Sequence, residues 1–286
     1  MKISVIVPVY NMERFVEECV NSILMQTLSD IEIICVNDGS TDSSLQILKA
    51  IQKKDARLKI FTTPNRGVAN ARNLGISHAV GDFVCFVDPD DFYPTSNVLK
   101  SLYDKCKGFD IVGGSLAIFD HKSKTIKKIF KGEDRKFVFG AEGEMSFADY
   151  QFDYGFTRFI YRRDFLISHK IYFPELSRYE DPPFLVAAML AAGKFYAIDD
   201  IVYYYRKNHK AVGNVWGDRS RVVDAIKGIV MVLEMAKNNN LFELYKTGFK
   251  HLEELTAIVS DKYLEIKPYR KRKNYWLIRK PFFWRK

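Results

Sequence analysis

The segment Asp88-Pro89-Asp90-Asp91 gathers three carboxylates within four residues. Carboxylates this close repel one another unless a cation lies between them. Oxygen ligands of this kind suit Mg²⁺ or Mn²⁺, which usually complete their coordination shell with substrate phosphates. The alternative is a solvated acidic turn in which Pro89 only interrupts regular structure. The position of the segment, directly after a buried strand-like run, favours the metal site.

Asp38 is a second candidate, because it follows an apolar run at 31–36 and precedes a Gly-Ser-Thr turn. A carboxylate in this place can accept hydrogen bonds from the imide of a nucleotide base or from a ribose hydroxyl. The same spacing also fits an Asx-turn and helix cap built from Asp38, Ser40 and Asp42. The residues alone leave both interpretations open.

Alternating strands and helices are predicted to position these residues. Apolar runs indicate buried strands at 3–9, 31–36, 58–62 and 82–87. Helices are expected between them, at about 12–26, 40–50 and 67–79. Asn11 is a candidate cap for the first helix. This order predicts an α/β fold with a mostly parallel central sheet flanked by helices, and ligands of such sheets bind beyond the carboxyl ends of the strands.

The second half of the chain is expected to be more irregular and partly antiparallel. Strands are predicted at 109–119, 123–139 and 195–206. Helical patterns occur near 162–168, 183–192, 219–237 and 241–263. The helices after residue 219 form a C-terminal helical extension and a candidate surface for a homodimer.

Composition excludes several classes of protein. Hydrophobic residues make up 47% and charged residues 28% of the 286 residues, which is typical of a globular chain. No apolar run approaches the roughly 20 residues that span a bilayer, and no signal peptide is expected at the N-terminus. The absence of GxGxxG and GxxxxGK(S/T) patterns disfavours Rossmann dehydrogenases and P-loop NTPases. The four cysteines show no metal spacing and are expected to be buried thiols in a reducing, cytoplasmic compartment.

The net charge of +9 lies in the last twenty residues, 267–286, which hold nine Lys and Arg and no acidic residue. The remaining residues carry equal numbers of acidic and basic side chains. Two of the three Trp residues also fall in this basic-aromatic tail, which favours attachment to an anionic membrane surface. A disordered tail is the alternative. Nucleic-acid binding is not expected, because no recognition fold accompanies the charge.

Five stretches give the chain a resemblance to the family 2 glycosyltransferases of the GT-A fold, over roughly residues 1–210. They are SVIVPVYN (4–11), VNDGSTD (36–42), NRGVANARNLGI (65–76), GDFVCFVDPDD (81–91) and RYEDPPF (178–184). The order and spacing of these stretches agree with the family as well as their letters. The resemblance implies an inverting enzyme that uses a nucleotide sugar and Mn²⁺ or Mg²⁺.

The resemblance also implies roles for individual residues. Asp90, with Asp88, would bind the metal ion, and Asp91 would support the sugar or the metal's surroundings. Asp38 would contact the uracil of a UDP donor, and Arg72 would approach the diphosphate or ribose. The other residues expected at the nucleotide are Pro8, Tyr10, Asn65 and Gly67.

Asp181 is the general base that the resemblance implies, and Glu180 precedes it. The reaction needs one carboxylate on the acceptor side to take the proton of the attacking hydroxyl. A structural role is the alternative, because Asp before Pro182 is a good N-cap with proline at the first helical position. Both roles are compatible.

Residues 203–216 are either a surface loop or a lid that closes over the donor phosphates. His209 in this segment is expected at the diphosphate or metal, by resemblance to similar enzymes. The other four histidines, His78, His121, His169 and His251, fit no cluster in the sequence and are expected to be incidental.

The expected organisation is a catalytic domain at 1–215, with a nucleotide-sugar half (1–110) and an acceptor half (111–215), then a helical extension (216–266) and the tail. The expected function is transfer of one sugar from a UDP-sugar to a glycan acceptor, lipid-linked at the cytoplasmic face of the membrane, in surface polysaccharide synthesis. The absence of a QxxRW motif disfavours a processive synthase. A protein-modifying glycosyltransferase and a non-catalytic nucleotide-sugar-binding module are the alternatives.

Overall fold

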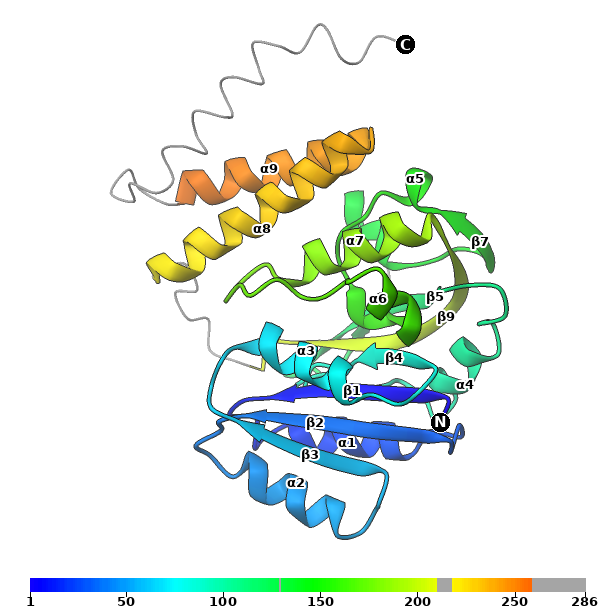
Figure 1. Cartoon of the computed structure of the whole chain (residues 1–286), viewed down its shortest axis with the longest axis vertical. Helices are drawn as coiled ribbons and strands as arrows, with labels where there is room; N and C mark the ends of the chain where they lie inside the picture. Colours follow the sequence, from blue (N-terminus) through cyan, green and yellow to red (C-terminus); the bar gives the residue numbers. More distant parts are fainter. Residues whose placement is uncertain (129, 210–217, 259–286) are drawn as a thin grey trace, which may run out of the picture.

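The computed structural model describes residues 1–128, 130–209 and 218–258. Strands and helices alternate in its first part (Figure 1), as β1 (Ile3–Val9), α1 (Val16–Leu24), β2 (Ile31–Asp38), α2 (Ser44–Gln52), β3 (Leu58–Thr63), α3 (Val68–His78) and β4 (Phe83–Phe86). Every residue of β1 and β2 is buried. The unbroken β-branched runs predicted these strands because a parallel strand covered on both faces has no solvent side.

The second part is less regular. Its elements are α4 (Val98–Tyr103), β5 (Ile111–Asp120), β6 (Ile126–Lys127), η1 (Gly132–Phe137), β7 (Gly143–Ser146), α5 (Phe147–Tyr150), η2 (Phe156–Arg158), β8 (Phe159–Arg162), α6 (Arg163–Ser168), α7 (Asp181–Ala192) and β9 (Lys194–Lys207). Two helices follow, α8 (Arg219–Asn238) and α9 (Phe242–Ile258).

One mixed sheet joins both parts in the order β3-β2-β1-β4-β8-β5-β9-β7, with β6 paired to β5. The strands β1 to β4 run parallel, as predicted. The strand β8 then lies antiparallel between β4 and β5, while β5 and β9 pair in parallel. The predicted α/β class is therefore confirmed, and the parallel character is concentrated in the first part of the chain.

Helices cover both faces of the sheet. Val5 and Val7 of β1 pack with α1, α2 and α4 on one face, whereas Ile6 packs with α3, α6 and α7 on the other. This division follows from the alternation of side chains along a strand. The layers bring α3 and α7 onto the same face, next to the carboxyl end of β4 (Figure 1).

The helices α8 and α9 pack as a pair, and α8 lies against α7. Their shared apolar cluster includes Ile226, Ile229, Leu252 and Leu255. The pair forms a third layer above α7, on the side away from the sheet (Figure 1). The tail at 267–286 lies outside the described residues. So does the part of the predicted lid after residue 209.

Asn11 does not cap the first helix, so this prediction was wrong. Helix α1 begins at Val16 after Phe15, and Asn11 adopts a left-handed backbone with φ of 53°. Its side-chain oxygen instead accepts hydrogen bonds from the Thr41 backbone and hydroxyl at 2.8 and 3.3 Å. The residue ties together the two loops at the carboxyl ends of β1 and β2.

The predicted strand at 123–139 was also wrong in most of its length. Only the short β6 is a strand there, and Gly132–Phe137 forms a 3-10 helix. Helix α4 was not predicted. Asp181 is the first residue of α7, and the cap position belongs to Glu180.

The four cysteines are buried and form no disulfide, as expected. Among the described residues, no helix combines the length and the apolar character needed to cross a membrane.

Candidate active site

A cleft of about 710 Å³ opens at the carboxyl end of β4. Asp88, which follows β4, and Asp181, at the start of α7, both line it, together with Arg72 of α3. These three predicted site residues are therefore brought together. The other predicted residues lie outside the lining of this cleft, at the carboxyl ends of β1 and β2 or on the loops that follow β1, β3, β4 and β9.

Arg72 connects the two carboxylate-bearing segments. Its Nη2 donates to Asp88 Oδ1 at 2.8 Å and its Nη1 donates to Glu180 Oε1 at 2.7 Å. The guanidinium is buried and lies 4.6 and 5.1 Å from the centroids of the Phe156 and Phe173 rings. Both terminal nitrogens are thus held by protein carboxylates, which positions Arg72 as a link between the motif at 88–91 and the segment before Asp181.

Close packing of α3 on β1 explains how Arg72 reaches this place. A Cβ atom on Gly75 would lie 2.4 Å from the Ile6 side chain, so only glycine allows the helix to approach the strand this closely. Arg72 is one turn earlier on the same helix and therefore lies beside the end of β4.

The predicted base, Asp181, has a perturbed pKa. Burial raises the pKa of its carboxyl to about 7, and the neighbouring Glu180 and Asp88 carboxylates also raise it, while Arg72 lowers it. A carboxyl group near pKa 7 can alternate between its protonated and ionised forms at neutral pH. Asp181 therefore has the protonation behaviour that a general base needs.

The acidic residues of the segment 88–91 differ in their burial and in their hydrogen-bond partners. Asp91 is almost completely buried, and accepts hydrogen bonds from Tyr203 Oη at 2.8 Å and from the Arg206 backbone at 2.7 Å. The Asp90 side chain is 15% exposed, and its Oδ2 is 2.9 Å from Nε2 of the similarly enclosed His209. Asp91 therefore supports the loop, while Asp90 and His209 form a largely buried polar pair.

Arg206 of β9 stabilises this loop through hydrogen bonds of its side chain. Its Nε donates to the Asp90 carbonyl oxygen at 2.6 Å, and its Nη2 donates to Glu18 at 2.7 Å. His121 lies 3.1 Å from Arg206 Nη1 and makes an edge contact with the His209 ring. His121 was expected to be incidental, and its position beside His209 follows from the return of β9 alongside β5, which the sequence does not show.

The donor set fits a divalent cation only in part. No group of three or more His, Cys, Asp and Glu side chains within the described ranges is arranged to hold a metal ion. Asp90 Oδ2 and His209 Nε2 are, however, hydrogen-bond partners at 2.9 Å, and carboxylate and imidazole groups both bind divalent cations in proteins. These two residues fit as two ligands, with substrate phosphate and water needed to complete the shell.

The Asp38 carboxylate accepts its hydrogen bonds from other residues of the chain. It accepts hydrogen bonds from the backbone amides of Arg66 and Gly67, both at 2.8 Å, and from Thr63 Oγ1 at 3.2 Å. These contacts fix the loop between β3 and α3, where Asn65 and Gly67 lie. Of the predicted Asx-turn residues, Asp42 makes that turn, since its Oδ1 accepts from the Ser44 amide at 2.9 Å, while Asn37 Oδ1 accepts from the Ser40 amide at 3.3 Å.

Pro8 and Tyr10 lie at the carboxyl end of β1. Pro8 pairs with Val36 inside the sheet and is buried, whereas 44% of Tyr10 is exposed. Of these two predicted residues, only Tyr10 offers an open ring face.

Sequence reasoning missed most of the residues that line the cleft. Tyr154, Tyr179 and His251 are among them. They come from three separate segments, and no local pattern relates them.

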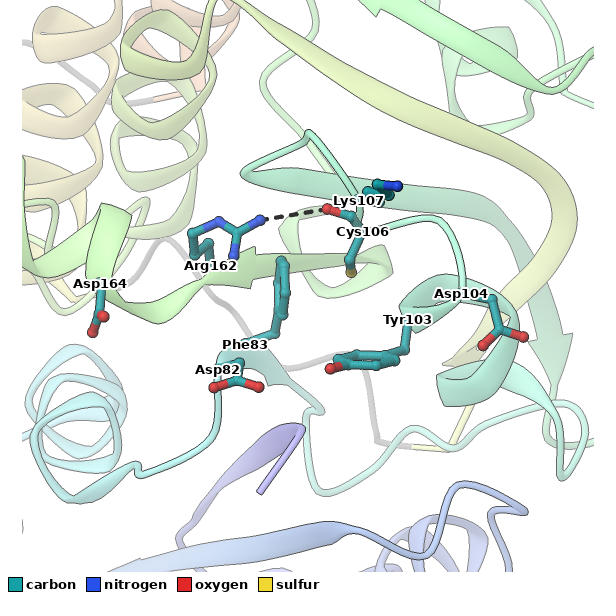
Figure 2. A pocket seen from close by; sticks show the side chains of 8 residues that line it. All are labelled: Asp82, Phe83, Tyr103, Asp104, Cys106, Lys107, Arg162 and Asp164. Atoms are coloured by element: carbon teal, nitrogen blue, oxygen red, sulfur yellow. Dashed lines mark hydrogen bonds between the residues drawn. The ribbon is translucent and has the colours of Figure 1, made fainter.

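A second hollow of about 450 Å³ lies at the other end of β4 and includes Asp82, Asp164 and Arg162. Figure 2 shows Arg162 directed toward the Cys106 carbonyl oxygen there, a 3.4 Å contact far along β4 from Asp88.

Comparison with known proteins identifies the family. The sequence profile of Glycosyl transferase family 2 matches residues 4–169. The chain belongs to this family. The predicted resemblance to this family, and with it the predicted GT-A fold, is thereby confirmed.

Several members of the family are similar to this chain. The uncharacterized glycosyltransferase EpsJ of Bacillus subtilis is 35% identical over 74% of this chain and 63% of its own length. The poly(ribitol-phosphate) β-glucosyltransferase of Bacillus spizizenii is 32% identical over 79% of this chain and 37% of its own length. The chain therefore spans less than two thirds of either relative.

Solved structures share the fold. Staphylococcus aureus TarS 1–349 in complex with UDP-GlcNAc matches with a TM-score of 0.64 and 25% identity, over 94% of this chain and 78% of that one. A mannosyltransferase of Pyrobaculum calidifontis in complex with GDP-Man and Mn²⁺ matches with a TM-score of 0.61 and 15% identity, over 95% and 79% of the two chains.

Proposed function

We propose that this protein is an inverting, metal-dependent, non-processive glycosyltransferase that moves one sugar from a UDP-sugar to a glycan acceptor. The observation that carries the proposal is the single cleft lined by both Asp88 and Asp181. Arg72 ties the loop of the first to the segment of the second. A donor held at the motif 88–91 and an acceptor held beside Asp181 would meet in this cleft.

Asp181 acts as the general base. Its carboxylate takes the proton from the acceptor hydroxyl while the hydroxyl oxygen attacks the anomeric carbon of the donor sugar. The bond from that carbon to the diphosphate oxygen breaks on the opposite face, so the configuration inverts. The products are the new glycoside, UDP and a proton on Asp181. A pKa of about 7 allows the residue to lose that proton again at neutral pH.

Asp90 and His209 would hold the divalent cation, Mn²⁺ or Mg²⁺, with Asp88 beside them. When bound, the cation offsets the negative charge that develops on the leaving diphosphate. Arg206 and Asp91 keep the Asp90 loop in place through the contacts described above. The mannosyltransferase that shares the fold was solved with GDP-Man and Mn²⁺, which supports a cation in the proposed reaction.

The nucleotide would lie across the ends of β1, β2 and β3. Tyr10 offers an exposed ring for stacking on the base, and Asp38 orients the amides of the loop that holds Asn65 and Gly67. A UDP donor is supported by the TarS structure, which contains UDP-GlcNAc.

The acceptor side is proposed from the relatives and from the tail. Transfer to a surface polymer fits the similarity to the poly(ribitol-phosphate) β-glucosyltransferase. The basic-aromatic tail would hold the enzyme at an anionic membrane surface, where a lipid-linked saccharide is available.

Co-sedimentation with anionic vesicles, compared between the full chain and a 1–266 truncation, tests this attachment to the membrane. Equal sedimentation of both proteins would contradict it.

Release of UDP from a panel of UDP-sugars, with Mn²⁺ and with EDTA, tests the activity directly. The proposal predicts slow hydrolysis of one UDP-sugar that EDTA abolishes. Binding of UDP without any release or transfer, with every donor in the panel, would favour the non-catalytic binding module instead.

A further inference from the structure

Tyr154, Tyr179 and His251 form a cluster on the wall of the active-site cleft. Tyr154 lies in the loop before η2, and Tyr179 stands two residues before Asp181. His251 comes from α9, in the C-terminal helical extension. The extension, for which the sequence suggested only a homodimer surface, therefore contributes a side chain to the cleft of the catalytic domain.

The polar atoms of the cluster face one another. The Tyr154 and Tyr179 hydroxyls form a hydrogen bond. His251 Nδ1 lies 3.2 Å from Tyr179 Oη and 3.4 Å from Tyr154 Oη. Each phenol oxygen can both donate and accept, and the imidazole can do either according to its tautomer. The cluster thus presents phenol and imidazole groups that can exchange hydrogen bonds with the hydroxyls of a ligand.

Burial keeps both tyrosines in the neutral form. It raises the pKa of the Tyr154 and Tyr179 phenols above their ordinary value. The three rings meet edge to face, with Tyr154 at 74° to Tyr179 and 75° to His251. An apolar wall with a few convergent polar atoms is the usual form of a small-molecule site.

The helical pair holds Tyr179 in a conformation that an isolated chain rarely adopts. Tyr179 has a φ of 67°, in the left-handed region that disfavours a residue with a bulky side chain. Helix α8 packs against it so closely that a Cβ atom on Gly228 would lie 2.4 Å from the Tyr179 carbonyl oxygen. Strain of this kind persists where the surroundings enforce it, and it gathers at functional sites.

A second contact fixes the same segment. Asp224 Oδ2 of α8 accepts hydrogen bonds from the Ser177 amide and hydroxyl, both at 2.9 Å. The segment from Ser177 to Glu180 is therefore clamped by α8 on one side and tied to Arg72 on the other. Both restraints act directly before Asp181.

We propose that Tyr154, Tyr179 and His251 form the acceptor subsite, and that they bind the hydroxyl groups of a neutral sugar ring whose reacting oxygen faces Asp181. The helical pair α8–α9 is then part of the acceptor site rather than a separate appendage. The inference rests on the proposed glycosyl transfer and specifies which side chains receive the acceptor and which class of group they bind.

The test compares His251→Ala and Tyr154→Phe with the wild-type protein. The acceptors are a panel of p-nitrophenyl glycosides, the donor is the UDP-sugar that the wild type hydrolyses, and Mn²⁺ is present. The loss of hydrogen-bonding groups predicts that KM for the glycoside rises about five-fold or more in each variant. The affinity for UDP, measured in parallel, should be unchanged, because neither residue lies on the nucleotide loops. Lys250→Ala is the matched control, since its side chain is exposed on the same helix.

The outcomes separate this inference from the proposed function. A wild-type protein that neither binds UDP nor transfers sugar would contradict the function itself. Normal transfer with an unchanged KM in both variants would overturn the subsite, and so would a parallel loss of UDP affinity, which indicates a structural role. A wild type that hydrolyses its donor but uses no glycoside in the panel would contradict recognition of a neutral sugar ring.

Discussion

Arg72 and Glu180, 108 residues apart in the sequence, form a buried ion pair with 2.7 Å between Nη1 and Oε1. The other arm of the same guanidinium holds Asp88 at 2.8 Å. The donor-side loop and the acceptor-side helix are therefore joined through one side chain. Because Arg72 also opposes the rise in the pKa of Asp181, it affects both the geometry of the cleft and the protonation of the base.

Removing this link should damage stability and activity together. Arg72→Ala leaves two carboxylates without their cation, and loss of one partner of a buried pair costs about 3 to 5 kcal/mol. Thermal unfolding should show the lower stability. Arg72→Lys keeps the charge but cannot reach both carboxylates with separate nitrogens, so we expect an intermediate stability and a large loss of turnover. Wild-type turnover in Arg72→Lys would contradict the bridging role.

The rate should depend on pH through Asp181. The base is protonated and inactive below its pKa of about 7, and ionised above it. For the free enzyme, kcat/KM should therefore rise about ten-fold per pH unit below that value and level off above it. A profile measured at saturating Mn²⁺ checks this, and a flat profile from about pH 5.5 to 8 would contradict the protonation state that we assign.

His209 should contribute to metal-dependent binding of the donor. Its Nε2 lies 2.9 Å from Asp90, and both residues are proposed ligands. In His209→Ala and Asp90→Ala, the Mn²⁺ concentration that supports half-maximal UDP binding should rise about ten-fold or more. The control is His169→Ala, an exposed histidine at the C-terminal end of α6. Calorimetric titration of UDP at several Mn²⁺ concentrations measures the effect, and unchanged affinity in Asp90→Ala would contradict the metal assignment.

Gly228 should be intolerant of a side chain. The new Cβ would lie 2.4 Å from the Tyr179 carbonyl oxygen, so either α8 or the segment before Asp181 must move. We expect Gly228→Ala to lower kcat about ten-fold or more, despite the roughly 1 kcal/mol that alanine gains in a helix. Gly248→Ala in α9 is the matched control, because its Cβ would meet side-chain atoms alone, the nearest being a Leu233 methyl at 3.2 Å. Equal activity of the two variants would contradict the clamp.

The first part of the fold could be predicted because its sequence is locally consistent. Buried parallel strands need unbroken apolar runs, and the polar residues that follow them must gather at one edge of the sheet. This reasoning placed Asp88 and Asp90 correctly after β4. Asp181 entered through the family resemblance, and the structure adds its neighbours.

The second part could not be predicted in the same way, because long-range contacts decide it. Asn11 has the chemistry of a helix cap, but a hydrogen bond to Thr41 on another loop places it elsewhere. The Lys-rich stretch after residue 121 alternates too weakly to specify a strand, and most of it is not one. His251 lies in the site only because α9 folds back over the segment before α7, and nothing local to its sequence indicates that.

The most direct test of the central claim is the Asp181→Asn variant. Asparagine keeps the shape of the side chain and removes the base, so the rate of sugar transfer should fall about 100- to 10,000-fold. The affinity for UDP in the presence of Mn²⁺ should stay close to that of the wild type. Asp164→Asn, an exposed residue of α6, serves as the control. Near-wild-type transfer by Asp181→Asn would show that another group takes the proton, and would contradict the mechanism.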